Sequence, residues 1–303
     1  MKLLLETLTA GTGYLEKRGV DEARLNMEHL LAHVLGCRRL DLYLRFNESL
    51  AEPDLITLRT LTRRRAEGEP LQHLLGTVDF LGHELVSDHR ALVPRPETEF
   101  LVDWLIKEYA AGRLSADLPG RLLDMAAGSG CIGLTLAAAW TKAGTAAMLA
   151  DISEDALDLA RLNASRLKLD TVQFVRSDLF DKIAGSFDLI VANLPYIPSG
   201  EIPTLSREVR RDPVLALDGG PDGLDIVRRF LSEAPPHLNP GAFIALEVGD
   251  DQAHRAAEHA RHLGYQSIRT FSDLAGIERF VLAQAPAALI PNAGAAEEIP
   301  DSA

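Results

Sequence analysis

Phe187-Asp-Leu-Ile-Val-Ala-Asn-Leu-Pro-Tyr-Ile197 is an apolar run that ends in a polar amide, a proline and an aromatic residue. The run predicts a buried strand, and open α/β sheets bind their ligands at the carboxyl ends of such strands. The side-chain oxygen of Asn193 and a neighbouring backbone carbonyl can each accept one N–H of a planar NH2 group, while the Tyr196 ring covers its flat face. Residues 193–196, hereafter the clamp, therefore suit methyl transfer to an amide or an exocyclic amine.

Apolar strands alternate with helices from residue 121 onward, which indicates βαβ units on a parallel sheet. The expected strands cover residues 121–125, 146–150, 172–175, 187–192, 242–248 and 279–283. The α/β catalytic domain as a whole is expected to span residues 96–284. Residues 1–75 read instead as a helical domain, because apolar residues such as Leu31 and Leu35 recur at helical spacing and no strand pattern competes there.

Residues 76–95 are expected to join the two domains as a hairpin and linker. The segments 78–86 and 90–93 would pair around a turn at residues 87–89. The tail, residues 285–303, is rich in Ala, Pro and Glu without periodicity, so it predicts disorder.

The amino-acid composition is typical of an ordinary globular protein. With 303 residues, 47% of them hydrophobic, the chain can bury a full core and is expected to hold two domains. Its formal charge of −13 argues against a surface that grips bare nucleic acid, so no direct nucleic-acid binding is expected. Cys37 and Cys131 lie far apart, so neither a disulfide nor a metal site is indicated, and a reducing cytoplasm fits. We expect neither a signal peptide nor a membrane span.

A turn of small residues follows the first expected strand of the sheet. It consists of Ala126, Ala127, Gly128, Ser129 and Gly130, and a helix follows it. Small residues let a ligand approach the backbone, and the N-terminus of a helix favours negative charge. On its own this signal is weak, because a tight turn without a ligand can have the same sequence.

Acidic residues follow the next two strands. Asp151 ends the second strand, where a carboxylate can accept both hydroxyls of a ribose, and Asp178 follows the third, where it can accept an adenine amino group. The alternative role for Asp151 is to cap the following helix, although Ser153 can take that role instead. A glycine turn with acids on successive strand ends favours a nucleoside cofactor.

Two nucleoside cofactors compete for this site. The spacing of Gly128, Gly130 and Gly133 fits the dinucleotide pattern Gly-x-Gly-x-x-Gly, but it does not decide between a dinucleotide and S-adenosylmethionine. Asp124, just before the turn, would repel a pyrophosphate and suit the ammonium of a methionine. The clamp residue Asn193 has no evident role in hydride transfer. S-adenosylmethionine is therefore the favoured cofactor.

Two further elements accompany the turn and the clamp: Pro94-Arg-Pro-Glu-Thr-Glu99 and Asp212-Pro-Val-Leu-Ala-Leu-Asp-Gly-Gly-Pro-Asp-Gly-Leu224. Together the four elements resemble the HemK/PrmC family, the protein-(glutamine-N) methyltransferases that modify the Gly-Gly-Gln tripeptide of peptide chain release factors. The resemblance covers residues 1 to about 284 in order. Adenine methyltransferases share the turn and an Asn-x-Pro-Tyr-like element, but they generally lack the other two.

The resemblance implies an α/β fold, a seven-stranded Rossmann-like methyltransferase sheet with a small N-terminal helical domain joined by a β-hairpin. It implies that residues 126–130 and Asp151 hold S-adenosylmethionine, with Leu179 and Asn193 beside it. The substrate glutamine would lie in the clamp, with Asn193, Pro195 and Tyr196 as catalytic residues and Leu194 as a further substrate contact. The helical domain would dock the release factor.

Two residues depart from the family pattern. Leu194 replaces the first proline of Asn-Pro-Pro-Tyr, which restores a backbone N–H and frees φ, while the carbonyl needed as an acceptor remains. The resulting Asn-Leu-Pro-Tyr also resembles the element of ribosomal-RNA adenine dimethyltransferases. Ala126 stands where the family usually has glycine, and its methyl group is expected to be tolerated only if φ stays negative.

Other polar residues are given simpler interpretations. His29 and His33 have a metal-like i, i+4 spacing without a third ligand, so they are expected at the surface or at a partner contact. Glu247 and Asp212 are interpreted as structural. A basic run reads as a solvated face: Arg59, Arg63, Arg64 and Arg65.

The sequence thus predicts a cytoplasmic S-adenosylmethionine-dependent methyltransferase that acts on a protein glutamine, with a peptide chain release factor as the expected partner. The alternatives are a ribosomal-protein glutamine methyltransferase, an RNA or DNA adenine methyltransferase, and a cofactor-binding module without catalysis. Intact Asn193, Pro195 and Tyr196 argue against the last, and the acidic charge argues against nucleic acid. Neither argument separates the two protein substrates.

Overall fold

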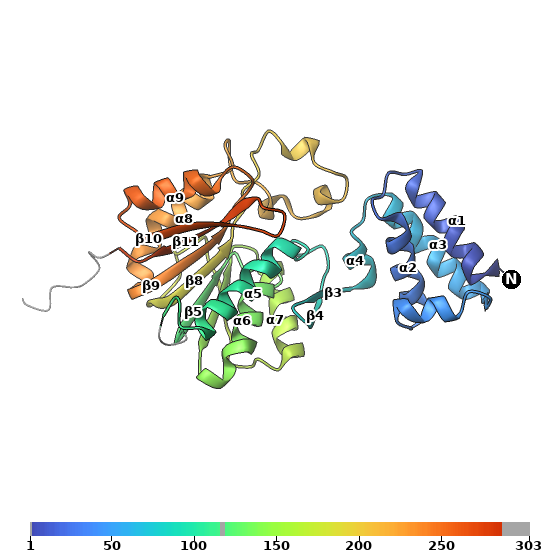
Figure 1. The fold of residues 1–303 in the computed structure, drawn as a ribbon, viewed down its shortest axis with the longest axis horizontal. Helices are drawn as coiled ribbons and strands as arrows, with labels where there is room; N and C mark the ends of the chain where they lie inside the picture. Colours follow the sequence, from blue (N-terminus) through green and yellow to red (C-terminus); the bar gives the residue numbers. More distant parts are fainter. Residues whose placement is uncertain (1, 116–118, 287–303) are drawn as a thin grey trace, which may run out of the picture.

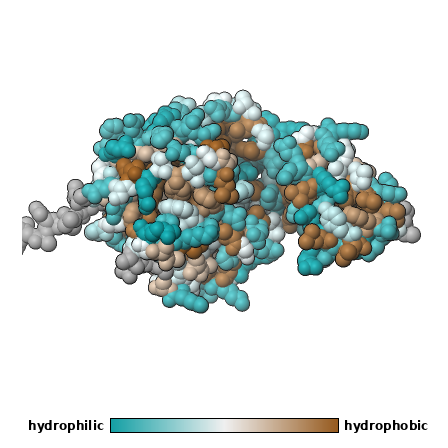
Figure 2. Space-filling view, viewed as in Figure 1, coloured by the Kyte–Doolittle hydropathy of each residue, from teal (hydrophilic) through white to brown (hydrophobic). Residues whose placement is uncertain are grey.

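The computed structural model describes residues 2–115 and 119–286, and they form two lobes of unequal size. A small helical lobe holds the N-terminal end of the chain, and the large lobe is built around a seven-stranded sheet (Figure 1). In the space-filling view a cleft separates the lobes beside their narrow connection (Figure 2). The predicted fold class is confirmed.

The sheet of the large lobe has the strand order β10-β11-β9-β8-β5-β6-β7. The strands are β5 (Arg121–Met125), β6 (Ala146–Asp151), β7 (Gln173–Arg176), β8 (Phe187–Asn193), β9 (Leu238–Glu247), β10 (Gln266–Ser272) and β11 (Glu278–Gln284). Pairing is parallel from β9 to β7, and β11 runs antiparallel to both of its neighbours. The strand order reverses between β5 and β8, so their carboxyl ends form a topological switch point, where ligands of such sheets bind.

Helices cover both faces of the sheet. One face carries α5 (Pro96–Ala110), α6 (Cys131–Trp140) and α7 (Glu154–Leu167), and the other carries α8 (Asp225–Glu233) and α9 (Ala253–His262). In the central strand β8, Leu189 and Val191 pack on the first set of helices, while Ile190 and Ala192 pack on the second. Burial of each large aliphatic side chain contributes about 1.5–3 kcal/mol, so the strand is fixed up to its last residue, Asn193.

The small lobe packs its own apolar core. Its helices are α1 (Leu4–Glu16), α2 (Ala23–Val34), α3 (Glu52–Ala66) and α4 (Leu71–Leu75), and Leu8, Leu30 and Leu58 are among the buried side chains between them. A short bridge of β1 (Lys2–Leu3) with β2 (Ser49–Leu50) ties the start of the lobe to α3. This bridge was not visible in the sequence, because two-residue strands leave no periodic pattern.

The hairpin between the lobes is shorter than predicted. It pairs β3 (Thr77–Phe80) with β4 (His83–Val86), and Leu81 and Gly82 form the turn with φ of 49° and 78°. The predicted turn at residues 87–89 is wrong. Two positive φ values match the twist of a tight hairpin, but leucine is a rare choice for the first of them and hid the turn. Glu99 accepts a hydrogen bond from the Leu81 N–H at 2.6 Å and supports this conformation.

The six strands predicted for the sheet are all present, and β10 is the one that sequence periodicity missed. This edge strand reads Gln-Ser-Ile-Arg-Thr-Phe-Ser, and its pairing with β11 shifts register at both ends. An edge strand with few buried side chains shows little alternation. Of the tail predicted to be disordered, residues 287–303 lie outside the described residues. Ala285 is buried, and its N–H donates to Ala242.

Candidate methyl-transfer site

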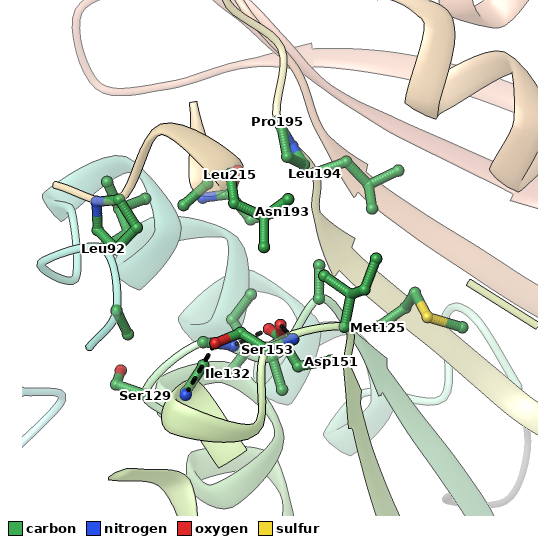
Figure 3. Close-up of a pocket in the computed structure, with 18 of the residues that line it drawn as sticks. Leu92, Met125, Ser129, Ile132, Asp151, Ser153, Asn193, Leu194, Pro195 and Leu215 are labelled. Carbon is green, nitrogen blue, oxygen red and sulfur yellow. Dashed lines mark hydrogen bonds between the residues drawn. The ribbon is translucent and has the colours of Figure 1, made fainter. Parts of the chain in front are cut away.

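An open cavity lies at the carboxyl ends of β5, β6, β7 and β8, at the switch point of the sheet. It encloses an empty volume of about 1160 Å³, part of which is open solvent. In Figure 3, Leu194 and Pro195 lie on one side of it, Asp151 and Ser153 lie on the opposite side, and Leu92 borders it from the 87–95 segment. The cavity therefore brings together most of the turn, Asp151, Asp178 and residues 193–195 of the clamp, which lie as far apart in the sequence as Ala126 and Pro195.

The small-residue turn after β5 is wound with three positive φ values. They are 57° at Ala126, 55° at Gly128 and 80° at Gly130. The condition expected for tolerating the Ala126 methyl group, a negative φ, is therefore not met. A non-glycine residue in this region costs roughly 1–2 kcal/mol, and such strain is often found where a ligand binds. Ala126, Ala127, Gly128 and Ser129 line the cavity, whereas Gly130 caps α6 and packs on Leu134 and Leu149.

Asp124 lies beneath the turn and is fully buried. Its Oδ2 accepts a hydrogen bond from the Gly133 N–H at 2.7 Å, and Oδ1 has no hydrogen-bond partner among the described residues. A Cβ on Gly133 would lie 2.7 Å from the Asp124 Cβ, so the third glycine of the motif is required for helix packing. Burial raises the pKa of Asp124 to about 7, and the Gly133 hydrogen bond opposes that rise.

Asp151 ends β6 and lines the cavity. Its Oδ2 accepts from the Gly128 N–H and its Oδ1 from the Ser153 N–H, both at 2.9 Å. Burial raises the pKa of Asp151, and these backbone hydrogen bonds lower it. Ser153, not Asp151, caps α7, because its Oγ accepts from the Ala156 N–H at 3.3 Å. The remaining lone pairs of Asp151 are thus available at the cavity wall.

Asp178 and Leu179 follow β7, and both line the cavity. Leu179 is buried and has a φ of 44°, a second strained residue at this site. Asp178 is half exposed and forms an ion pair with Arg229 at 3.3 Å. One carboxylate oxygen of Asp178 is therefore paired with Arg229 of α8. The sequence did not indicate this ion pair.

The side-chain amide of Asn193 is held by two neighbours. Its Nδ2 donates to Glu247 Oε1 at 3.0 Å and to Thr98 Oγ1 at 3.1 Å. The Thr98 hydroxyl in turn donates to Glu247 Oε2 at 2.7 Å. Because a carboxylate oxygen only accepts, the NH2 group of Asn193 faces Glu247 and its Oδ1 faces away. No described residue donates to this Oδ1, and Asn193 lines the cavity.

The backbone of the clamp is fixed by the glycines of the 212–224 element. A Cβ on Gly219 would lie 2.7 Å from the Pro195 carbonyl oxygen, and a Cβ on Gly223 would overlap the Tyr196 carbonyl oxygen. Gln252 Nε2 donates to that Tyr196 oxygen at 2.8 Å. These glycines are therefore needed for close packing, which gives a physical reason for this part of the element.

The side chains of the clamp differ in what they contact. Leu194 is 1% exposed and packs in the core on the α8 and α9 side of the sheet, while it also borders the cavity with Pro195. Tyr196 is not among the residues that line the cavity, and its ring lies near Gly249. Burial raises the pKa of Tyr196 to about 12, so its hydroxyl is neutral at physiological pH.

An ion pair closes the cavity on the side of the helical lobe. Arg95 lines the cavity and binds Asp212 Oδ2 at 2.6 Å, and the Val93 N–H donates to Asp212 Oδ1 at 3.3 Å. Burial raises the pKa of Asp212 to about 6 even though Arg95 lowers it. The pair pins the segment that carries Leu215, another cavity residue, to the Pro-Arg-Pro segment.

Two residues at the site were missed or undervalued from the sequence. Thr98 was not singled out, and Glu247 was interpreted as structural, yet both contact Asn193. Glu247 is an acid at the end of an apolar strand, the same signal that identified Asp151. Thr98 left no signal beyond its place in Pro94-Arg-Pro-Glu-Thr-Glu99, because only the packing of α5 on the sheet brings it to β8.

The basic run of α3 is only partly solvated. Arg59 and Arg64 pair with Glu52 and Glu69 at the surface. Arg65 is 5% exposed, donates to Asn26 Oδ1 at 2.6 Å and pairs with Glu208 of the large lobe, so its predicted solvation is wrong.

The predicted histidine pair lies on α2. His33 is exposed and His29 is half-buried. Over the described ranges, no group of three His, Cys, Asp or Glu side chains could hold a metal ion. No helix in the described part of the chain is both long and apolar enough to cross a membrane.

The residues around the cavity fit S-adenosylmethionine. The Asp151 carboxylate suits ribose hydroxyls, and Oδ1 of buried Asp124, which has no partner among the described residues, leaves a free acceptor beneath the turn. Ile152, Leu179 and Ile226 supply apolar contacts of the kind that a flat adenine ring needs.

The sheet, with its antiparallel strand β11, and the cofactor-type turn after β5 define a Rossmann-like methyltransferase, and residues 98–206 match the methyltransferase small domain family. Residues 6–76 match the PrmC N-terminal domain family. The release factor glutamine methyltransferase of Deinococcus radiodurans is 41% identical over 281 residues, 93% of this chain and 98% of the relative. The chain therefore belongs to the release factor glutamine methyltransferase family and is a methyltransferase.

A second relative matches most of the chain in sequence, and a solved structure matches its fold. The release factor glutamine methyltransferase of Rhodopirellula baltica is 39% identical over 278 residues, 90% of this chain and 93% of the relative. Among solved structures, the hMettl16 catalytic domain in complex with MAT2A 3′UTR hairpin 6 superposes with a TM-score of 0.53 at 16% identity, covering 78% of this chain and 84% of that one. At this identity the likeness shows the fold alone.

Proposed function

We propose that this enzyme transfers a methyl group from S-adenosylmethionine to the side-chain amide nitrogen of a glutamine, in the Gly-Gly-Gln motif of a peptide chain release factor. The pair of free acceptors in the clamp carries this proposal. Asn193 Oδ1 and the Leu194 carbonyl oxygen accept no hydrogen bond from any described residue, whereas both N–H groups of Asn193 are taken. A primary amide has two N–H donors to match two such acceptors.

The clamp residues make the amide nitrogen reactive by position and charge. An amide nitrogen is a poor nucleophile because its lone pair is delocalised into the carbonyl. Acceptors on both N–H groups favour the positive charge that develops on nitrogen as the new bond to carbon forms. They also fix the nitrogen in one place, which removes most of the entropic barrier to an in-line attack. The N-methylated amide is a cation as long as it keeps both N–H protons, so it is very acidic, and one of these protons passes to solvent after transfer.

Pro195 and Tyr196 hold this geometry in the proposal. Pro195 has a fixed φ and cannot donate, so it stiffens the peptide next to the Leu194 carbonyl. Tyr196 does not line the cavity, and in the proposal it supports the clamp through its backbone, which Gln252 holds at the Tyr196 carbonyl. The neutral Tyr196 hydroxyl, with its pKa raised to about 12 by burial, adds no charge to the site.

The turn and the acids would hold S-adenosylmethionine. Residues 126–130 would contact its methionine part, Asp151 its ribose, and Asp178 and Leu179 its adenine, with Asn193 at the border between cofactor and substrate. When bound, this cofactor supplies a methyl group on a positively charged sulfur. The small size of Gly128 and Ser129 keeps the backbone accessible on the cavity side.

The proposed substrate follows from the relatives and from the architecture. The two relatives that align with nearly all of this chain are named release factor glutamine methyltransferase. A helical lobe beside the large lobe provides a second surface for a protein substrate, and a cleft lies between the two lobes (Figure 2). We propose that the release factor docks on this lobe.

The test is a labelling experiment. The enzyme is incubated with S-adenosylmethionine labelled in the methyl group and with purified release factor, either native or with its Gly-Gly-Gln glutamine replaced by alanine. We expect label on the native protein alone. Label on both proteins, or on neither, would overturn the assignment. Parallel reactions with a ribosomal protein fraction and with single-stranded DNA and RNA that contain adenine test the alternative substrates, and preferential labelling there would replace the proposal.

A further inference from the structure

Asn193 can act as a clamp only if its amide oxygen, and not its NH2 group, faces the substrate. The two ends of an asparagine amide have nearly the same shape, so packing alone does not distinguish them. A rotation by 180° about the Cβ–Cγ bond would present N–H donors to the N–H donors of the substrate. The orientation must therefore be set by hydrogen-bond partners on the far side of Asn193.

Glu247 and Thr98 are those partners. Glu247 ends β9, the neighbour of β8, and its register partner in the sheet is Asn193 itself. Thr98 lies in the first turn of α5. The side chains are buried, at 1% exposure for Glu247 and 2% for Thr98, so water does not substitute freely for either.

With Glu247 ionised, the direction of each hydrogen bond in this trio is determined. The hydroxyl proton of Thr98 is used toward Glu247 Oε2, so only its oxygen lone pairs face Asn193. Glu247 Oε1 is likewise an acceptor. Both N–H groups of Asn193 thus meet acceptors, and the rotated amide would instead place Oδ1 against two oxygen atoms in a buried site. That arrangement leaves Asn193 Oδ1 and Glu247 Oε1 without a donor and is unfavourable.

We propose that Glu247 and Thr98 are positioning residues that set the donor and acceptor directions of the Asn193 amide. Through Asn193 they select a substrate side chain that presents N–H donors. The inference rests on the proposed glutamine methylation and deepens it, because it assigns selection of the primary amide to two residues that act through Asn193. Sequence reasoning gave Glu247 only a structural role.

The sharpest test compares two substitutions of Thr98. Thr98→Val keeps the shape and removes the hydroxyl, whereas Thr98→Ser keeps the hydroxyl and removes a methyl group. We expect Thr98→Val to lower kcat for full-length release factor by roughly tenfold or more, because the lost hydrogen bonds act through the orientation of Asn193. The dissociation constant for S-adenosylmethionine should change by less than about threefold, and Thr98→Ser should retain kcat within about threefold.

Glu247 offers a second comparison. Glu247→Leu removes both acceptors, whereas Glu247→Gln can keep an oxygen toward Asn193 and turn its NH2 group toward the Thr98 oxygen. We expect Glu247→Leu to lose kcat by roughly tenfold more than Glu247→Gln, again with little change in affinity for S-adenosylmethionine. If Glu247→Leu does not fold, the two Thr98 variants decide the question.

The outcomes separate this inference from the proposed function. Native kcat in Thr98→Val, or an equal loss in Thr98→Val and Thr98→Ser, would overturn the positioning role. A loss of affinity for S-adenosylmethionine as large as the loss of kcat would also overturn it, because Thr98 would then support the cofactor site. The native enzyme is assayed in parallel. Its failure to label the Gly-Gly-Gln glutamine removes the proposed function and the inference with it, whereas native labelling with an unaffected Thr98→Val removes the inference alone.

Discussion

The two ends of the cavity are built in different ways. At the cofactor end, Asp124 and Asp151 accept hydrogen bonds from the backbone of Gly133, Gly128 and Ser153, residues 9, 23 and 2 positions away. At the amide end, Asn193 is held by the side chains of Thr98 and Glu247, which are 95 and 54 positions away. Backbone donors come with any turn of the right shape, whereas side-chain partners depend on the residue type. The amide end should therefore be the more sensitive to single substitutions.

The largest effect is expected for Asn193→Ala. This change removes one of the two proposed acceptors, so kcat should fall by about a hundredfold or more, in the range seen when a single preorganised polar group is lost. Affinity for S-adenosylmethionine should change little, since the cofactor end retains its own contacts. Steady-state kinetics with release factor and calorimetric titration of the cofactor check the two quantities. Equal losses in both would show that the two ends are not separate.

The cofactor end is tested by Asp151→Asn. The asparagine has one acceptor oxygen in place of two, so either Gly128 or Ser153 loses its hydrogen-bond partner and the cofactor loses a charged acceptor. The dissociation constant for S-adenosylmethionine should rise by about tenfold to a hundredfold, which corresponds to the loss of one charge-assisted hydrogen bond. At saturating cofactor kcat should recover most of its native value. A kcat that stays low at saturation would contradict the proposed division of roles.

Stability should depend on pH through one buried acid at each end. Burial raises the pKa of Asp124 and that of Glu247 to about 7, above the value of about 4 for these groups in the unfolded chain. The folded protein therefore binds more protons between pH 4 and 7. The stability from these groups is fully present below pH 4 and is lost as pH rises through 7.

The measurement is urea unfolding of the cofactor-free enzyme between pH 5 and 8. The unfolding free energy should fall across this range, and the fall should be shallower in Asp124→Asn and in Glu247→Gln, because each replaces a titrating group by a neutral one. Asp54→Asn, at a partly exposed position in the first turn of α3, serves as a control for overall charge. An unchanged slope in both buried variants would show that neither carboxyl titrates in this range.

The smallest effect is expected for Ala126→Gly. Ala126 has a φ of 57°, where glycine has no steric penalty, although glycine also gains entropy in the unfolded chain. The net result should be an increase of about 0.5–1 kcal/mol in the unfolding free energy, measured by urea unfolding. Ala127→Gly, at a position without positive φ, should destabilise the protein instead and is the matched control. A destabilised Ala126→Gly would mean that the methyl group contributes packing that outweighs its strain.

Sequence patterns predicted the strands of the sheet well where these strands are buried apolar runs. The central strands are recognisable because their residues face apolar layers on both sides of the sheet, and β10 is not, because it is an edge strand with irregular pairing. The hairpin turn was misplaced because Leu81 adopts a positive φ that its residue type disfavours. Arg65 was predicted to be solvated because the sequence does not distinguish it from the other arginines of the run. Only the fold pairs it with Glu208.

By itself the sequence determined the elements of the site. The turn, Asp151 and the clamp each combine a strand end with residue types of known hydrogen-bonding capacity, and both features are local. Only the tertiary structure decided how the clamp is oriented, because the carboxylate of Glu247 and the hydroxyl of Thr98 reach Asn193 from a neighbouring strand and from a helix. Contacts between segments far apart in the chain depend on strand order and helix packing, and neither is recorded in the pattern of a single segment.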